Sequence, residues 1–575
     1  MRNHFFFPVF VAFALGVMGC DENPTTPPST GGNGGGGAGG EAGQGGGGAG
    51  GDGGGGAGGA AGQGGGGSGG GMSVEEQVAA KLDMVKGDAP ALRQFLDKMP
   101  KGADLHNHTS GAVTPESMIE WGAADGACFN QMTGFASAGP CAMGTVPMSD
   151  ALTNQALYDA MLQAWSMEGF TGTLLEGHQH FFDAFGKFGA ILTDARSDDM
   201  VAQVRSTAGR NHQLYIELMQ GFGSSAIGSV AETKFMMGDT WNEATLLQRR
   251  MDIISDPAFA TALATAKTNI ANSLTGSDTL LNCGTAMADV GCNVEVGLIV
   301  AANRTRTREY VFGQWVFAFE LAQSVPQVVG VNLVSPEEHA NSLMYYDDSM
   351  TAVGVLRAFN DKDMSRRTVH VGLHAGELIP EVLPMTMQGQ AHLTYHVRNA
   401  VDIAGAERIG HGADVLGESF GAGSMDLLMT MATKGVFVEI NLTSNDQLLG
   451  MKGTGHPIGA YLAANVPVGL STDDEGILRI EILDEYVRAV QEHDLGYLPL
   501  KKMVRNTLEH SFLGGSSLWK TRDDYTAYVT ECAADVPGNT PSAACDTFLM
   551  NNAKARIQWR HEVDVAAFEK AIVMP

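Results

Sequence analysis

Positive charge is scarce in this chain of 575 residues. Lysine and arginine number 36 against 64 aspartates and glutamates, which gives a formal net charge of −28. A surface this acidic repels a phosphate backbone, which argues against nucleic acid as a partner. The same charge favours a soluble, self-repelling surface, although it indicates nothing specific about a substrate.

Two motifs that often carry chemistry are also missing. The glycines of residues 21–71 do not form the GxxxxGKS/T pattern of a phosphate-binding loop. No two cysteines have the CxxC spacing, so a cysteine-based metal site is not expected. Apolar residues nevertheless make up 44% of the chain, which is enough for a sizeable core.

The N-terminus is similar to a bacterial lipoprotein signal. Arg2 supplies a positive charge, and residues 5–17 form an apolar run that is too short for a comfortable membrane span. Small residues then precede Cys20. We expect residues 1–19 to be a signal peptide and Cys20 to carry the lipid. An uncleaved anchor or a plain secretory signal is the alternative.

A low-complexity segment follows the expected lipidation site. Residues 20–71 are rich in Pro and Thr and then in Gly, a composition that cannot bury a core, so we predict a disordered tether. Such a tether of ~50 residues reaches about 40 Å. The folded domain would occupy residues 72–575 on the periplasmic or cell-surface side of the envelope. Whether it is also released is left open.

Six further cysteines fall into three pairs that are close in sequence. Each pair brackets a Gly-, Ala- or Pro-containing segment typical of a loop. An exported protein sits in an oxidising compartment, where close cysteines form disulfides. We therefore predict three local disulfides, Cys128 with Cys141, Cys283 with Cys292, and Cys532 with Cys545.

Eight short apolar segments recur along the folded domain, and a helical stretch follows each one. This alternation predicts an α/β fold, a parallel (β/α)8 or TIM barrel, with a doubly wound open sheet as the alternative. About 500 residues exceed the roughly 250 that are typical, so insertions are expected around residues 128–141, 221–292 and 521–545. The strands are predicted at residues 103–108, 214–218, 294–301, 328–334, 369–374, 408–411, 436–440 and 466–471.

Histidines and an aspartate stand at the ends of four predicted strands. His106 and His108 end the first, and their i, i+2 spacing points both imidazoles to one face. His374 ends the fifth, His411 ends the sixth, and Asp473 follows the eighth. Taken alone, an HxH pair is more often two ordinary polar histidines. Because strand ends of a barrel meet at one face, three histidines and one aspartate can converge on a divalent cation such as Zn²⁺.

The same segments resemble the adenosine deaminase family. The resemblance runs from about residue 81 to 512. An MPKG lead-in, the export signal and the cysteine-bracketed insertion look most like its secreted, growth-factor-related branch. The motifs are MPKGADLHNH at 99–108, HAGE at 374–377, RIGHG at 408–412, EINLTSN at 439–445, STDD at 471–474 and RNTLEHSF at 505–512.

The resemblance implies one zinc ion per chain. Bound zinc can lower the pKa of a water molecule to about 7, which gives hydroxide at neutral pH. The other zinc deaminase design uses a PCxxC motif, which is absent here. By resemblance, the metal ligands would be His106, His108, His374 and Asp473.

The resemblance also implies three residues that act on the purine. Glu377 would give a proton to N1 of the ring as hydroxide adds at C6, and one carboxyl group can relay both protons that the reaction needs. His411 would orient or stabilise the metal-bound hydroxide. Asp474 would hydrogen-bond N7.

Three positions depart from the family pattern. Ser110 stands where the family commonly has an acidic residue that meets the ribose, and a hydroxyl is the weaker partner. Ser335 replaces a glycine whose backbone meets N3, and Glu475 stands where proline often follows the two aspartates. We expect substrate contacts from Ser110, Ser335 and Asp474, so the departures bear on nucleoside recognition rather than on deamination.

The expected activity is zinc-dependent deamination of adenosine or 2'-deoxyadenosine to inosine or deoxyinosine plus ammonia, for purine scavenging outside the cytoplasm. One alternative is another aminopurine, such as adenine or a modified adenosine. The other is a catalytically silent purine-binding lipoprotein. A second HxH pair, His178 and His180, lies in an aromatic, helix-like segment, which we interpret as packing or a substrate lid rather than a second metal site. The oligomeric state is left open.

Overall fold

The computed structural model describes residues 72–419 and 424–574. The predicted signal peptide, the lipidation site Cys20 and the predicted tether fall on residues 1–71, outside the described residues. The features assigned to them therefore stay predictions. Within the described residues, no helix is long and apolar enough to cross a lipid bilayer.

Eight parallel strands form one sheet whose order follows the sequence, β1-β5-β6-β7-β8-β9-β10-β11. The first and last strands meet at a parallel bridge between Asn107 and Asp473, where the His108 backbone N–H donates to the Asp473 carbonyl at 3.1 Å. The sheet therefore closes on itself as the predicted (β/α)8 barrel, and the open doubly wound sheet is wrong.

The observed strand bounds lie within two residues of the predicted ones. The apolar segments are buried on both faces because side chains fill the barrel and helices cover it, which explains their continuous apolar runs. The strands are β1 (Gly102–His108), β5 (Gln213–Gln220), β6 (Glu295–Asn303), β7 (Val328–Val334), β8 (His370–Ala375), β9 (Arg408–His411), β10 (Phe437–Ile440) and β11 (Val468–Leu470).

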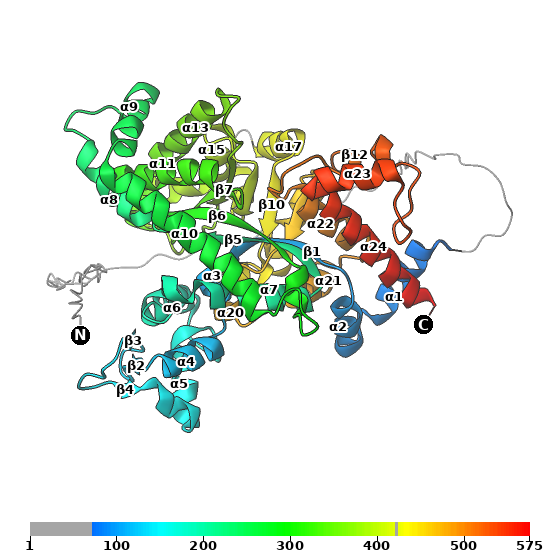
Figure 1. The fold of residues 1–575 in the computed structure, drawn as a ribbon, viewed down its shortest axis with the longest axis horizontal. Helices are drawn as coiled ribbons and strands as arrows, with labels where there is room; N and C mark the ends of the chain where they lie inside the picture. Colours follow the sequence, from blue (N-terminus) through cyan, green and yellow to red (C-terminus); the bar gives the residue numbers. More distant parts are fainter. Residues whose placement is uncertain (1–71, 420–423, 575) are drawn as a thin grey trace, which may run out of the picture. The chain divides into compact units, whose positions relative to one another are not determined.

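Helices cover the outside of the sheet (Figure 1). The most enclosed is α11, where Phe312, Trp315 and Phe317 are fully buried because it packs against β6, β7 and neighbouring helices. Two further helices, α1 (Val74–Val85) and α2 (Ala89–Asp97), precede β1. The covering helices include α7 (Ser197–Arg210), α8 (Ser224–Lys234), α11 (Arg308–Ser324), α13 (Tyr346–Asp361), α15 (His396–Asp402), α17 (Ser424–Lys434), α19 (Ile458–Ala463) and α22 (Tyr497–Glu509).

Three insertions account for the length beyond a minimal barrel, and they lie where the sequence predicts them. The first follows β1 and combines a small three-stranded sheet with helices α4 (Pro115–Ala124), α5 (Gln155–Trp165) and α6 (Leu174–Phe188). The second holds α9 (Glu243–Ile254) and α10 (Pro257–Leu280). The third contains the hairpin β12 (Trp519–Thr521) and β13 (Asp524–Tyr528), followed by α23 (Ala543–Asn551) and α24 (Ala553–Val573).

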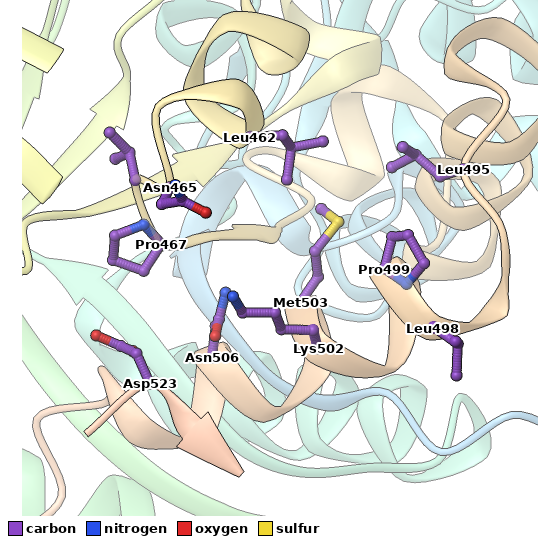
Figure 2. Close-up of a pocket in the computed structure, with 11 residues that line it drawn as sticks. Leu462, Asn465, Pro467, Leu495, Leu498, Pro499, Lys502, Met503, Asn506 and Asp523 are labelled. Atoms are coloured by element: carbon purple, nitrogen blue, oxygen red, sulfur yellow. The ribbon is translucent and has the colours of Figure 1, made fainter. Parts of the chain in front are cut away.

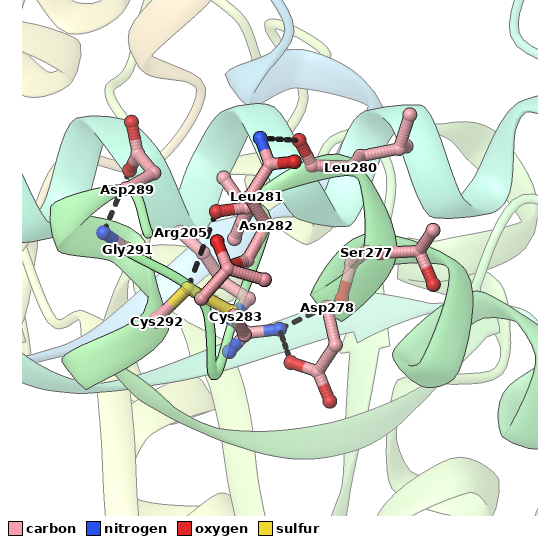
Figure 3. The surroundings of a disulfide bond; sticks show 12 residues. Arg205, Ser277, Asp278, Leu280, Leu281, Asn282, Cys283, Asp289, Gly291 and Cys292 are labelled. Carbon is pink, nitrogen blue, oxygen red and sulfur yellow. Dashed lines mark hydrogen bonds and ion pairs between the residues drawn. A yellow bond between two sulfur atoms is a disulfide. The ribbon is translucent and has the colours of Figure 1, made fainter. Parts of the chain in front are cut away.

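All three predicted disulfides are present, one in each insertion. Figure 3 shows the bond between Cys283 and Cys292, which joins the end of α10 to the residues before β6. Beside it, Arg205 of α7 donates to Ser277 Oγ at 2.8 Å and to Asp278 Oδ1 at 2.7 Å. These contacts attach the second insertion to a helix of the barrel.

Candidate metal centre and active site

Four side chains predicted as metal ligands meet at the carboxyl end of the barrel. His106 and His108 come from β1, His374 from β8, and Asp473 from the residues after β11. Their nearest ligand atoms all lie within 4.8 Å of one another. His108 Nε2 is 3.1 Å from His374 Nε2, and Asp473 Oδ1 is 3.3 Å from His106 Nε2 and 3.2 Å from His108 Nε2.

A buried carboxylate orients the first ligand, His106. Its Nδ1 lies 2.6 Å from Glu439 Oε2, and Glu439 is also paired with the cation Arg408 at 2.8 Å. The carboxylate accepts, so His106 Nδ1 carries a proton and Nε2 is the nitrogen that faces the other ligands. His106 Nε2 is buried and has no hydrogen-bond partner among the described residues.

Asn332 orients His374 in the same way. Asn332 Oδ1 accepts the backbone N–H of Leu333 at 2.7 Å and that of His374 at 3.0 Å, which identifies this atom as the oxygen. It also lies 2.9 Å from His374 Nδ1, which must therefore donate. The lone pair of His374 Nε2 then faces the metal group. This role of Asn332 was not predicted from the sequence.

The surroundings of His106 favour positive charge. Burial alone would lower the pKa of His106, but hydrogen bonds with Asp473 and Glu439 outweigh it and raise this pKa to about 10. The same carboxylates favour a metal cation at this place. Three imidazole nitrogens and one carboxylate oxygen form a donor set that fits a divalent ion such as Zn²⁺.

Glu377 and His411 lie beside this group, as predicted. His411 Nε2 is 3.7 Å from Glu377 Oε1 and 3.8 Å from Asp473 Oδ2. Burial, together with the nearby charge of Asp473, raises the pKa of Glu377 well above its usual value, which favours the protonated carboxyl. Burial lowers the pKa of His411 to about 3, which keeps the ring neutral.

Glu337 fixes the backbone that carries Glu377, a role that the sequence did not reveal. Its carboxylate accepts the backbone N–H of Gly376 at 3.1 Å and that of Glu377 at 2.9 Å. Burial would raise the pKa of Glu337, but Arg304 and His396 lower it to about 2, so the carboxylate stays ionised. The loop after β8 is therefore held by a buried charged acceptor.

Asp474 is an unsatisfied acid at the edge of the metal group. Its Oδ1 is buried without a hydrogen-bond partner among the described residues. Burial and the charge of Asp473 raise the pKa of Asp474 well above its usual value, which favours the neutral form that can donate a hydrogen bond. Gly111 permits this arrangement, since a Cβ there would lie 1.5 Å from Asp474 Oδ1.

The three departures from the family pattern also have definite places. Ser110 is half-buried in the short helix α3 (Thr109–Ala112), one residue before Gly111. Ser335 follows β7 with φ of +82°, a left-handed conformation that glycine adopts more readily. Glu475 starts the short helix α20 (Glu475–Leu478) and is buried. The substrate contacts assigned to Ser110 and Ser335 stay predictions.

The second HxH pair lies on α6, as predicted, and takes no part in the metal group. His178 Nε2 is 2.9 Å from Glu338 Oε1, and its Nδ1 is 3.3 Å from the Leu448 carbonyl. His180 Nε2 instead lies 2.9 Å from the Ser166 carbonyl. His178 therefore ties the first insertion to the loop after β7 and to α18 (Leu442–Leu449).

A separate cavity of about 410 Å³ lies away from this chemistry (Figure 2). Val466 and Pro467, which precede β11, line it together with Leu498 and Met503 of α22. The cavity is therefore at the amino end of the strand, whereas the metal group is at the carboxyl ends. None of the residues in the metal group lines it.

A family model described as Adenosine deaminase matches residues 277–523, which include His374, Glu377, His411 and both aspartates. Over these residues, the chain is similar to the adenosine deaminase family. The match agrees with the resemblance that the motifs indicate. Membership of the growth-factor-related branch stays a prediction.

Curated adenosine deaminases match over part of their length. The Clostridium perfringens enzyme (strain 13 / Type A) is 28% identical over 165 residues, which cover 26% of this chain and 48% of that protein. The Shigella boydii serotype 18 enzyme is 29% identical over 160 residues, which cover 28% and 42%. The chain thus spans about half the length of the curated relatives that it matches.

Among solved structures, the adenine deaminase from Arthrobacter aurescens aligns with a TM-score of 0.44 at 17% identity. The alignment covers 72% of this chain and 94% of that chain. The fold assignment rests on the closed parallel sheet itself.

Proposed function

We propose that this protein is a zinc-dependent deaminase that converts adenosine or 2'-deoxyadenosine and water to inosine or deoxyinosine and ammonia. One observation carries the proposal: a group of three histidines and one aspartate lies directly beside Glu377, a buried carboxyl whose raised pKa favours its protonated form. A cation site beside a proton donor is what hydrolytic deamination of a purine requires.

The metal would be held by the four converging ligands of β1, β8 and the residues after β11. Bound Zn²⁺ would lower the pKa of water to about 7 and so supply a nucleophile at neutral pH. The protein's part is to hold each imidazole with its lone pair inward, through Glu439 for His106 and Asn332 for His374.

Glu377 would move the protons. As an oxygen nucleophile adds to C6, the protonated carboxyl gives its proton to N1 of the ring. The resulting carboxylate takes one proton from the added water oxygen and passes it to the departing amine. The second proton of that water returns to the carboxyl, which is then protonated again. The C6–N bond breaks, ammonia leaves, and the 6-oxo purine remains, so one carboxyl group completes the proton balance.

Asp474 and His411 would place the substrate and the nucleophile. A neutral Asp474 can donate a hydrogen bond to N7, an acceptor on the purine ring, and its buried Oδ1 has no hydrogen-bond partner among the described residues. The neutral ring of His411 lies between Glu377 and Asp473, so it can orient the attacking oxygen.

A second candidate keeps the chemistry and changes the substrate to adenine or a modified adenosine. Ser110 and Ser335 motivate it, because both stand at positions that meet the nucleoside in the family. A third candidate, a silent purine-binding lipoprotein, is disfavoured because the residues needed for metal binding and proton transfer are all in place.

We also propose that the protein acts at the cell envelope, outside the cytoplasm. The support is the N-terminal signal-like sequence together with three disulfides, which are stable in an oxidising compartment.

The test follows the ultraviolet spectrum of metal-replete protein with adenosine, 2'-deoxyadenosine and adenine in parallel. Conversion of adenosine to inosine that disappears on chelation and returns with Zn²⁺ is the expected result. Conversion of adenine or another purine alone would favour the second candidate. Silence with all three, in protein that binds zinc, would contradict the deaminase proposal.

A further inference from the structure

Three buried side chains form a line that ends on His411. His456 Nε2 lies 3.0 Å from Asn445 Oδ1, and Asn445 Nδ2 lies 3.0 Å from His411 Nδ1. His411 and Asn445 are completely buried, and His456 is 4% exposed. We propose that Asn445 and His456 are positioning residues that hold His411 in the tautomer with its proton on Nε2, the nitrogen that faces the metal group.

A backbone group sets the direction of every hydrogen bond in this line. The N–H of Ile458 donates to His456 Nδ1 at 3.2 Å, so this nitrogen is an acceptor and carries no proton. A neutral imidazole has one proton, which must then be on Nε2. Burial lowers the pKa of His456 to about 3, in keeping with a neutral ring.

The amide of Asn445 connects the donor role of His456 to the acceptor role of His411. Because His456 Nε2 donates, the Asn445 atom that faces it must be the oxygen, and the amide nitrogen must face His411. That NH₂ group donates to His411 Nδ1, which leaves the single proton of His411 on Nε2. The tautomer is thus determined by a peptide N–H of residue 458, two side chains away from the active site.

Two further contacts favour the same arrangement. His411 Nε2 has two carboxyl oxygens as its nearest acidic neighbours, Glu377 Oε1 at 3.7 Å and Asp473 Oδ2 at 3.8 Å, and a donor suits this position. Asn441 Nδ2 lies at 3.4 and 3.5 Å from the two ring nitrogens, beyond the usual hydrogen-bond range, so Asn445 decides the tautomer.

The line is held on a rigid support. Asn445 belongs to α18, whose first backbone N–H groups, those of Leu442 and Thr443, donate to the buried carboxyl of Glu485 at 2.6 and 3.0 Å. His411 itself has φ of +66°, a left-handed backbone conformation that is uncommon for residues other than glycine. The hydrogen bond from Asn445 holds its ring in place.

The kinetic consequence rests on the proposed function, whereas the tautomer does not. With its proton on Nε2, His411 donates toward the attacking oxygen. With the proton on Nδ1, Nε2 would have only a lone pair and could not donate a hydrogen bond to the attacking oxygen. His411 would then no longer orient that oxygen. We expect loss of this donor to lower kcat by about 100-fold or more and to leave KM within about twofold.

The most direct variant is Asn445→Asp, which has nearly the same shape but two acceptors. A carboxylate at residue 445 accepts from both neighbours, so the proton of His411 must move to Nδ1. His456→Glu tests the same line independently: its acceptor draws the amide nitrogen of Asn445 and turns the amide oxygen toward His411. His493→Gln is the matched control, because the His493 ring packs against the His456 ring with centroids 5.8 Å apart but takes part in none of the hydrogen bonds of the line.

The decisive readout is nitrogen-15 NMR of histidine-labelled protein, which reports the protonated nitrogen without any need for activity. The His411 signal is assigned by its loss in His411→Gln, and thermal unfolding confirms that each variant folds. We expect Nε2–H in the parent and the His493→Gln control, and Nδ1–H in the two relay variants. Nε2–H retained in both relay variants would overturn the proposal.

Kinetics tests the consequence on the same samples. A fall in kcat in the two relay variants, with KM and the control unchanged, supports the positioning role. A shifted tautomer with unchanged kcat would overturn it. If the parent deaminates nothing, the proposed function fails, while the NMR result still decides the tautomer.

Discussion

The chain contains two HxH pairs, one on a strand and one on a helix, and only the strand pair points both side chains to one place. His106 and His108 lie on β1, where alternate residues share a face, and both turn their Nε2 atoms to Asp473. His178 and His180 lie on α6, where residues two apart diverge, and they contact Glu338 and the Ser166 carbonyl. The same spacing therefore brings two imidazoles into the candidate metal group on the extended strand but separates them on the helix.

Removing an imidazole from the first pair should have the largest effect. In His106→Ala the metal group loses one of four ligands and leaves Glu439 without its partner. We expect bound zinc to disappear and deamination to fall by about 1,000-fold or more. Metal analysis and the ultraviolet assay measure both effects. His180→Ala is the matched control from the second pair and should keep zinc and activity.

Glu377→Gln separates metal binding from proton transfer. The amide is close in size and lacks the acidic proton, so turnover should fall by about 100- to 10,000-fold. Zinc content should stay at the parent level, because Glu377 is outside the group of His106, His108, His374 and Asp473. Full activity in this variant would contradict the proposed mechanism.

Glu439→Gln tests whether the carboxylate that orients His106 contributes to zinc binding. The amide can still accept a hydrogen bond from His106 but loses the charge that strengthens it. We expect zinc affinity to fall by about 10- to 100-fold. Competition with a chelator measures the change, and an affinity equal to the parent's would show that the Glu439 charge is not needed.

His178→Gln probes the second pair and should have the smallest effect. The variant loses the hydrogen bond between α6 and Glu338 in the loop after β7. We expect the free energy of unfolding to fall by about 1 kcal/mol. Denaturant unfolding measures this cost, and zinc content should not change. A variant that loses its zinc would mean that α6 contributes to the metal site.

Much of the site could be predicted from sequence because its ligands stand at strand ends. The barrel brings those ends to one face, so His106, His374 and Asp473 were predictable from local spacing and strand order alone. The three disulfides were predictable for a similar reason, since each closes a short local loop.

The residues that orient the ligands were harder to predict. Glu439, Asn332 and Glu337 reach partners on or after other strands, over 333, 42 and 40 residues of sequence respectively. Nothing local distinguishes a carboxylate that supports a ligand from one that caps a helix, as Glu485 does for α18. The contact of Glu439 with β1 depends on closure of the sheet, whereas Asn332 and Glu337 depend on the pairing of β7 with β8.

The central claim is that the β1 pair holds a catalytic zinc ion and that the α6 pair does not. The most direct test is the zinc content per chain of the parent, His106→Ala and His178→Gln, measured after equal metal loading. The account predicts one zinc per chain in the parent and in His178→Gln, and none in His106→Ala. Zinc retained in His106→Ala, or lost in His178→Gln, would contradict it.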